Sequence, residues 1–297
     1  MKEKLALIGA GAMGGAIGAR LVATGTPLSV FDLDPEKSGA LVKQGATLAA
    51  SAADAATGAA AIILSLNNAR IVEAAVFGPQ GVAEGAANTA LIIDMSSIDP
   101  AATRALAERA SERGLGWVDS PLSGGIPKAA SGALTLMQGG TEDDVVLAQK
   151  LLGNLAANQT HMGPAGAGQT TKLINQVLCG LGFIAVAETT ALAEAAGVDA
   201  TRIPQALRGG RADSALLQEY MPRFAARDYR RTGRIDNMVK DLDGALDFAR
   251  LGHTSMPMTA LCAELHRMLT AAGLGGEDQA ALMEYFKGAG NTLGAKD

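Results

Sequence analysis

Four short motifs in this sequence hold residue types that could do chemistry, and they follow one another in a fixed order over most of the chain. The first is a glycine-rich turn at 8–14, and the second is a Ser-Pro-Leu-Ser-Gly-Gly run at 120–125. The third is a lysine shortly after Gly-Pro-Ala-Gly-Ala-Gly at 163–168, and the fourth is Lys-Asp-Leu at 240–242. In order, these residue types can bind a phosphate, bind a second anion, exchange a proton and supply a further cation. Together they predict an enzyme that binds a nucleotide.

The glycine-rich turn has the spacing G-x-G-x-x-G of a dinucleotide-binding turn, between an apolar run and an amphipathic pattern. The first glycine permits the tight turn, the second lets the backbone approach a pyrophosphate, and the third allows the following helix to pack closely. The start of that helix offers N–H donors and the positive end of its dipole. The residues of the turn that we expect to contact the cofactor are Gly9, Gly11, Ala12, Met13 and Gly14.

Asp32 ends the second apolar run, roughly 20 residues beyond the turn, where dinucleotide-binding domains place a ribose-binding carboxylate. A carboxylate there accepts hydrogen bonds from a ribose 2′-hydroxyl and repels a 2′-phosphate, so we expect NAD, with NADP less favoured. The alternative for Asp32 is a simple turn residue before Asp34 and Pro35.

Two further polar residues, Asn67 and Ser96, follow apolar runs and are expected where two strands end. The carboxyl ends of parallel strands form the edge at which doubly wound sheets bind ligands, so both residues are candidate contacts for the cofactor. Ser96, with Ser97, could instead cap a helix that begins near Asp99 and Pro100.

Ser123, Gly124 and Gly125 form the candidate substrate turn. Two successive glycines can present backbone N–H groups to an anion, and the serine hydroxyl adds a further donor. This combination suits a small-molecule substrate with a carboxylate. The alternative is an ordinary turn, which favours the same residue types.

Lys172 lies near the start of a largely apolar segment, where a solvated lysine is unexpected, and it could exchange a proton with a substrate. The alternative is a lysine that extends from the helix end into water. Asn175 and Gln176 lie about one helical turn further on and are candidate substrate contacts. Lys240 could close the site over the nicotinamide or the substrate, or it could form a surface charge pair with Asp241.

The spacing of apolar residues predicts two domains, 1–163 and 164–297, that position these motifs. In the first, continuous apolar runs alternate with helical patterns, which predicts an α/β domain with a doubly wound parallel sheet of the Rossmann type. The second is expected to be all-helical and to begin with a long connecting helix that is apolar on nearly every face, as in a domain centre or a subunit interface. The expected strands are 4–9, 28–32, 61–66, 91–95 and 116–119, and the expected helices are 13–23, 35–44, 169–196, 201–209, 213–227, 236–251, 257–272 and 277–288.

Composition and spacing argue against several classes of protein. A net charge of −5 gives no reason to expect nucleic acid or a membrane surface as a partner. The two cysteines and three histidines have no metal-ligand spacing, so we expect no metal site. The longest apolar stretch, 177–187, is too short to span a bilayer, and glycines break the N-terminal apolar run, which favours a buried strand over a signal peptide. We therefore expect a cytoplasmic protein.

The four motifs, in this order and over nearly the whole chain, resemble the β-hydroxyacid dehydrogenase family. The resemblance implies a Rossmann domain, one long connecting helix and a helical C-terminal domain that helps to form a homodimer or homotetramer. It also implies that Lys172 is the catalytic acid/base, that residues 123–125 hold the substrate carboxylate, and that Lys240 lies near the nicotinamide. The positions that match the family pattern include Met13, Asp119, Pro121, Ser123, Gly124, Gly125, Ala129, Gly132, Leu134, Gly166, Gly168, Lys172, Lys240, Asp241 and Leu242.

One departure from the family pattern lies close to Lys172. The family commonly has Lys-x-x-Asn-Asn, whereas this chain has Gln176 in the last position. Glutamine keeps the amide but is one methylene longer, so the reacting oxygen must sit differently. We expect this departure to change the substrate more than the reaction class.

The predicted function is NAD-linked interconversion of a small 3-hydroxy acid and its semialdehyde or keto form. One alternative is a reductase for an imine, or for a sulfonated or phosphorylated aldehyde, in which Arg211 or Arg234 binds a second anionic group. Imine reductases usually lack the family lysine, so Lys172 argues against that branch. The other alternative is a non-enzymatic nucleotide-binding module, which the presence of both Lys172 and Lys240 disfavours.

Overall fold

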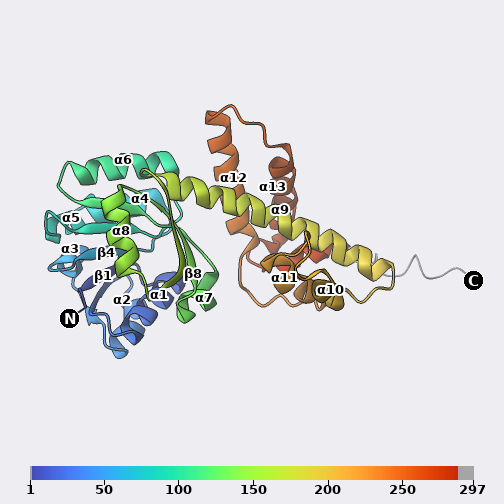
Figure 1. The fold of residues 1–297 in the computed structure, drawn as a ribbon, viewed down its shortest axis with the longest axis horizontal. Helices are drawn as coiled ribbons and strands as arrows, with labels where there is room; N and C mark the ends of the chain where they lie inside the picture. The colour runs from blue at the N-terminus through green and yellow to red at the C-terminus, as the bar shows by residue number, and fades with distance from the viewer. Residues whose placement is uncertain (1, 287–297) are drawn as a thin grey trace, which may run out of the picture. The chain divides into compact units, whose positions relative to one another are not determined.

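The computed structural model describes residues 2–286 and divides the chain into two compact units, Met1–Lys172 and Leu173–Asp297 (Figure 1). The division follows Lys172, whereas the sequence placed it after residue 163, so the first turn of the long connecting helix belongs with the sheet. The last two residues of the helix expected at 277–288 lie outside the described residues.

One mixed sheet, with nine strands among residues 2–286, forms the centre of the first unit. Its first six strands are parallel and lie in the order β3-β2-β1-β4-β5-β6, which is the strand order of a dinucleotide-binding Rossmann domain. The predicted fold class is therefore confirmed. The bounds of these strands are β1 Leu5–Ile8, β2 Leu28–Phe31, β3 Thr47–Leu48, β4 Ala61–Leu64, β5 Leu91–Asp94 and β6 Gly116–Asp119.

Alternate residues of the buried strands face two separate apolar clusters, one on each side of the sheet. In β1, Leu5 and Leu7 join one cluster and Ala6 and Ile8 join the other. Continuous apolar strands are thus covered by helices on both faces, as predicted. The helices that contribute to the first cluster are α1 (Ala12–Ala23), α2 (Pro35–Lys43), α7 (Gly125–Ser131) and α8 (Glu142–Leu151). Those that contribute to the second are α3 (Ala52–Ala56), α4 (Ala69–Phe77), α5 (Val82–Gly85) and α6 (Pro100–Ser111).

Three strands that the sequence did not predict extend the sheet beyond β6. They are β7 (Leu122–Ser123), β8 (Leu134–Gly139) and β9 (Ala156–Gly163). The strand β8 runs antiparallel to β6 and β7 and parallel to β9. Because β9 is polar and largely exposed, it lacks the apolar run that identifies a strand in sequence.

The second unit is helical, and among its described residues the only strand-like pairing is an isolated bridge between Arg234 and Asp278. Its α-helices are α9 (Ala167–Ala195), which begins in the first unit, α10 (Ile203–Leu207), α11 (Ala215–Ala225), α12 (Ile235–Leu251) and α13 (Pro257–Leu269). The segment Gln279–Phe286, expected as part of an α-helix, is a 3₁₀ helix instead. It follows buried Asp278, whose carboxylate accepts the N–H groups of Thr232 and Gly233 and so fixes how this segment enters the unit.

The long helix α9 differs in two respects from the sequence expectation. Among the described residues it is the one helix long and apolar enough to cross a membrane by length and composition, although the run at 177–187 was judged too short. The core helix of a globular protein meets the same criterion, and α9 contributes Phe183 and Ala187 to the apolar core of the second unit. It is also not buried on every face, because Ile174, Leu178 and Leu192 are exposed.

Candidate active site

The three glycines of the first motif differ in whether the surrounding packing leaves room for a side chain. Gly9 has a φ of 94°, and a Cβ there would lie 2.4 Å from the carbonyl oxygen of Ser65. A Cβ on Gly14 would lie 2.0 Å from the carbonyl oxygen of Gly9, so these two positions are required by packing. Gly11 has an ordinary φ of −61°, and a Cβ on it would meet nothing within 4 Å. The protein's own packing does not demand glycine at 11, which fits a backbone that a pyrophosphate approaches closely.

Helix α1 begins at Ala12 directly after this turn, and no side chain among residues 2–286 caps it. Its first N–H groups have no partner inside the helix and are directed at whatever lies beyond the helix start. Ala12 is exposed, whereas Met13 is half-buried and packs against the first apolar cluster. An uncapped start of this kind favours a negatively charged ligand such as a phosphate.

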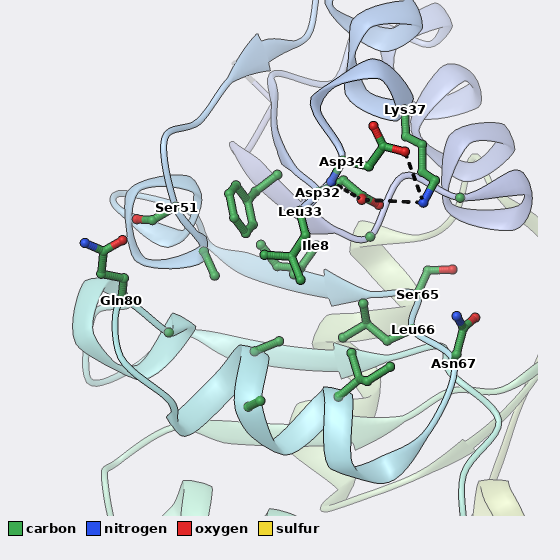
Figure 2. Close-up of a pocket in the computed structure, with 18 of the residues that line it drawn as sticks. Ile8, Asp32, Leu33, Asp34, Lys37, Ser51, Ser65, Leu66, Asn67 and Gln80 are labelled. Atoms are coloured by element: carbon green, nitrogen blue, oxygen red, sulfur yellow. Dashed lines mark hydrogen bonds and ion pairs between the residues drawn. The ribbon is translucent and has the colours of Figure 1, made fainter.

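A cavity of about 830 Å³ opens at the carboxyl edge of the sheet, beside the turn. It lies where the strand order reverses between β1 and β4, which is the usual ligand position in doubly wound sheets. Figure 2 shows Asp32, Asp34 and Lys37 near one end of the cavity and Ser51 and Gln80 at the other. Predicted cofactor contacts that line this cavity are Gly9, Gly11, Asp32 and Asn67.

Asp32 is more than a turn residue. One carboxylate oxygen accepts the N–H of Ala10 at 2.7 Å and the other accepts the N–H of Asp34 at 2.9 Å. Asp32 therefore holds the glycine turn against the end of β2. Lys37 Nζ lies 4.0 Å from Asp32 and 3.5 Å from Asp34, so two carboxylates and one ammonium group form this rim (Figure 2). Each carboxylate oxygen has two lone pairs, which leaves acceptor capacity for a ribose hydroxyl.

Ser96 connects two strand ends at the same edge of the sheet. Its hydroxyl accepts the N–H of Leu66 at 3.0 Å, and only 4% of the residue is exposed. Its alternative assignment as a helix cap is wrong, because the Asp99 side chain caps α6 by accepting two N–H groups. Asn67, next to Leu66, is exposed at the cavity.

The candidate substrate turn connects β7 to α7. Gly124 and Gly125 both have positive φ, at 122° and 65°, which a residue with a side chain adopts rarely. A Cβ on Gly124 would also lie 2.6 Å from Cδ of Lys128. Ser123, at the end of β7, is half-buried. The turn therefore needs glycine at both positions for its backbone conformation.

Lys172 is half-buried on the second turn of α9, and it is the last residue of the first unit. The helix turn before it is attached to the sheet by Asp119, the last residue of β6. One carboxylate oxygen of Asp119 accepts the N–H of Gly166, and the other accepts the N–H of Gln169, both at 2.8 Å. Burial raises the pKa of Asp119, and these backbone bonds oppose that effect.

A second buried carboxyl lies beside Asp119. Asp94 ends β5 and is the register partner of Asp119 on β6. One of its oxygens accepts the N–H of Ser96 at 3.0 Å, and the other has no hydrogen-bond partner among the described residues. Burial raises the pKa of Asp94 from 3.8 to about 7. This carboxyl is therefore largely protonated below neutral pH.

In the second unit, Gln176 is bonded to the Lys-Asp-Leu motif. Its amide nitrogen donates to Asp241 at 2.5 Å, and its amide oxygen accepts the Asn175 side chain at 2.9 Å. Lys240 Nζ lies 3.5 Å from Asp241, and 58% of the lysine side chain is exposed. The surface charge pair considered for Lys240 is thus present. The Asp241 side chain is only 16% exposed. Its hydrogen bond holds the side chain of Gln176, which is one methylene longer than the asparagine common in the family.

Two family models together match nearly the whole chain. Residues 4–163 match the NAD binding domain of 6-phosphogluconate dehydrogenase, and residues 166–286 match the NAD-binding domain of NADP-dependent 3-hydroxyisobutyrate dehydrogenase. The NAD-dependent L-serine dehydrogenase of Pseudomonas aeruginosa is 34% identical over 291 residues, which cover 96% of this chain and 98% of that protein. The 2-hydroxy-3-oxopropionate reductase of Escherichia coli is 34% identical over 284 residues, covering 96% and 97%. The chain belongs to the β-hydroxyacid dehydrogenase family.

The fold of a solved family structure agrees with this assignment. The 3-hydroxyisobutyrate dehydrogenase of Mycobacterium tuberculosis, solved with L-serine, has a TM-score of 0.87 to this chain at 27% identity. The match covers 97% of this chain and 100% of that one. The hydroxyacid dehydrogenase described here is thus an oxidoreductase that uses a nicotinamide cofactor, and the family inferred from the four motifs is confirmed.

Sequence reasoning gave no site role to four residues that organise the candidate site of this dehydrogenase, although Asp119 and Asp241 match the family pattern. All four side chains are buried or nearly so, and each hydrogen-bonds to Ser96, to Gln176 or to the helix start before Lys172. They are Asp94, Asp119, Gln169 and Asp241. A signal was present for Asp94 and Asp119, because each ends an apolar strand, where a buried charge is costly unless it is paired or hydrogen-bonded.

Proposed function

We propose that this dehydrogenase interconverts a small 3-hydroxy acid and its semialdehyde or keto form, with NAD as the hydride carrier. The observation that carries the proposal is that the first unit alone holds the glycine turn, the Ser-Gly-Gly turn and Lys172. Asp119 ties the last two together, since it lies four residues before Ser123 and bonds the helix turn before Lys172. A nucleotide site, an anion site and a proton-exchanging group thus belong to one unit.

The substrate class follows from chemistry that the relatives have in common. L-serine, 2-hydroxy-3-oxopropionate and 3-hydroxyisobutyrate, after which these relatives are named, each have a carboxylate and an oxygen on the third carbon. We extend this class to the present chain because its Ser123-Gly124-Gly125 turn suits a carboxylate. In this proposal Asn175 and Gln176 contact the substrate. The proposed cofactor contacts are Gly9, Gly11, Ala12, Met13, Gly14, Asp32, Asn67, Ser96 and Lys240.

In the proposed reaction the substrate carboxylate binds at the turn of residues 123–125. During oxidation Lys172 Nζ accepts the proton of the substrate hydroxyl, and during reduction it returns a proton to the carbonyl oxygen. NAD, held by the glycine turn and Asp32, would supply the acceptor for the hydride of the carbinol carbon. Acid/base help of this kind typically contributes about 10²–10⁴-fold to the rate, and positioning of the reactants contributes the rest.

A spectrophotometric screen tests the proposal. The purified enzyme would be offered short hydroxy acids with NAD and with NADP, and formation of the reduced cofactor would be followed. We expect turnover of 3-hydroxy acids, and much weaker turnover of matched alcohols in which a methyl group replaces the carboxylate. Equal rates for the acids and the matched alcohols would contradict a carboxylate site.

Asp32 should set the preference for NAD. Replacing it with serine removes a charge that repels a 2′-phosphate, and repulsion across a few ångströms near a surface amounts to about 1–4 kcal/mol. We expect Asp32→Ser to lower the ratio of kcat/KM for NAD over NADP by about 10-fold or more. Asp34→Ser is the matched control, because Asp34 is exposed at the same rim but is not bonded to the glycine turn. An unchanged ratio in Asp32→Ser would show that another residue discriminates the cofactors.

Gln176 should affect substrate choice more than catalysis. Asparagine is one methylene shorter, so Gln176→Asn cannot keep both the bond to Asp241 and the bond from Asn175. We expect the kcat/KM ratio between L-serine and 3-hydroxyisobutyrate to change about threefold or more, as for other single contacts of this size. The KM for NAD serves as the internal control and should stay constant. A uniform fall for all substrates would contradict a role in specificity.

Of the two arginines considered for a doubly anionic aldehyde substrate, Arg211 is exposed and Arg234 already has an acidic partner. Arg234 Nε donates to its neighbour Asp236 at 2.8 Å, so its charge is already balanced.

We also propose that the enzyme is a cytoplasmic homodimer or homotetramer. The exposed apolar side chains of Ile174, Leu178 and Leu192 on α9 support burial of this helix in a subunit interface.

A further inference from the structure

The first turn of α9 is fixed to the sheet immediately before the helix presents Lys172. We infer that Asp119 and Gln169 are positioning residues that hold Lys172 on the cofactor-binding unit. The inference rests on the proposed role of Lys172 in proton exchange. It goes beyond that role by naming the groups that set the position of the lysine.

Asp119 caps α9 from outside the helix. Its two carboxylate oxygens accept the N–H groups of Gly166 and Gln169, each at 2.8 Å. These N–H groups belong to the set at a helix start that has no partner within the helix, and the residue just before a helix usually supplies their acceptor. Here the last residue of β6 supplies it. The start of α9 and the end of β6 are therefore fixed to each other.

Glycines allow the helix to lie directly on the strand ends. A Cβ on Gly168 would lie 2.4 Å from the carbonyl oxygen of Met137 and 2.6 Å from that of Asp119. A Cβ on Gly139, in β8, would lie 2.8 Å from the backbone nitrogen of Gly168. Any side chain at these positions would force the helix away from the sheet. The close approach leaves the first turn of α9 little freedom to shift.

Gln169 ties the same turn to the loops around the cofactor cavity. Only 1% of this residue is exposed, and its amide nitrogen donates to the carbonyl oxygen of Ser96 at 2.7 Å. Its amide oxygen accepts the N–H of Ile98 at 3.2 Å. The Ser96 hydroxyl in turn accepts the N–H of Leu66, which lines the cavity. Gln169 thus links α9 to the segments that follow β5 and β4.

These contacts set the place of the proton-exchanging group. Lys172 is one helical turn beyond Gln169, about 4.5 Å along the helix axis at 1.5 Å per residue. We call Asp119 and Gln169 the anchor of α9. Ser123 of the substrate turn follows Asp119 by four residues in the chain. A misplacement of about 1 Å at a reacting group can cost about 100-fold in rate. Substitutions that break these hydrogen bonds should therefore slow proton exchange while NAD still binds.

The test uses the full-length enzyme with NAD and three variants. Gln169→Leu removes both side-chain bonds of the anchor, and Asp119→Asn removes one of the two acceptors at the helix start. Gln138→Leu is the control, because Gln138 is a fully buried glutamine of β8 whose amide bonds Ser120 rather than α9. The first readout is amide hydrogen exchange over residues 167–172. We expect exchange to be about 10-fold faster or more in the two anchor variants and unchanged in the control.

The second readout is kinetic, with a hydroxy acid found in the substrate screen. We expect kcat to fall about 10- to 100-fold in Asp119→Asn, whose side chain bonds the start of α9, while the Kd for NAD changes less than about threefold. The solvent deuterium isotope effect on kcat should increase, because proton exchange becomes slower relative to the other steps. A variant that merely lost folded molecules would show a lower kcat with an unchanged isotope effect.

The outcomes separate the anchor from the proposed function. Unchanged exchange over residues 167–172 in both anchor variants would overturn the anchor itself. Faster exchange with normal kcat and a normal isotope effect would overturn its role in placing Lys172. If the wild-type enzyme turned over no hydroxy acid, the proposed function would fail, whereas the exchange readout would still decide whether Asp119 and Gln169 fix the helix.

Discussion

Replacing Lys172 with alanine should lower kcat for the hydroxy-acid substrate by about 10²–10⁴-fold, the usual contribution of a positioned acid/base group. The Kd for NAD should change little, because Lys172 is not among the residues that line the cavity at the glycine turn and Asp32. The reason for the loss is that no group would then take the proton from the substrate hydroxyl. Single-turnover kinetics would measure the chemical step directly, and fluorescence titration would measure cofactor binding.

Two further variants separate proton exchange from charge. Lys172→Arg keeps the cation but cannot release a proton near neutral pH, since the arginine pKa lies above about 12. We expect it to be nearly as slow as Lys172→Ala. Lys150→Ala, which removes an exposed lysine of α8, should retain full activity. Recovery of activity in Lys172→Arg would indicate a purely electrostatic role, and near wild-type turnover in Lys172→Ala would remove Lys172 from the mechanism.

Replacing Asp94 with asparagine should stabilise the protein at pH 8 and have little effect near pH 4. Burial raises the pKa of Asp94 from 3.8 to about 7. Below about pH 4 the carboxyl is protonated in both the folded and the unfolded chain, so it costs nothing. As the pH rises toward 7, the unfolded chain loses this proton and the folded chain keeps it, so stability falls. Above pH 7 the penalty is constant at about 4 kcal/mol, from about 1.4 kcal/mol per pKa unit.

Asparagine removes this titration and keeps an oxygen that can accept the N–H of Ser96. Thermal unfolding of wild type and Asp94→Asn at pH 4, 6 and 8 would measure the effect. The difference in Tm should grow with pH and level off above pH 7. A difference in Tm that does not grow between pH 4 and pH 8 would contradict a raised pKa for Asp94.

The contrast between Asp94 and Asp119 has a simple physical basis. The two carboxyls end adjacent parallel strands in register, so each raises the cost of a charge on the other. Asp119 accepts two N–H groups from the start of α9, which favour its charged form. Asp94 is hydrogen-bonded to Ser96, whose N–H donates to one carboxylate oxygen, and its second oxygen has no partner among residues 2–286. Asp94 is therefore the member of the pair that holds a proton more readily.

Local patterns in the sequence predicted five of the six parallel strands and most helices of the second unit. The continuous apolar runs of β1, β4 and β5 identified a parallel sheet, because burial on both faces demands apolar residues at every position. The spacing of Gly9, Gly11 and Gly14 identified the turn. Asp34 and Pro35 predicted the start of α2, which the structure confirms. Each of these features depends on residues close together in the chain, so the sequence shows them directly.

Tertiary structure alone decided which polar groups meet. Asp119 bonds residues about 50 positions away, Gln169 reaches back to Ser96, and Gln176 bonds Asp241 from another helix. Strand β9 belongs to the sheet although its sequence is polar, because pairing with β8 satisfies its backbone. Periodicity and turn chemistry determine the type of an element over a few residues. The partner of a buried polar side chain depends on which elements pack together, and long-range packing determines that choice.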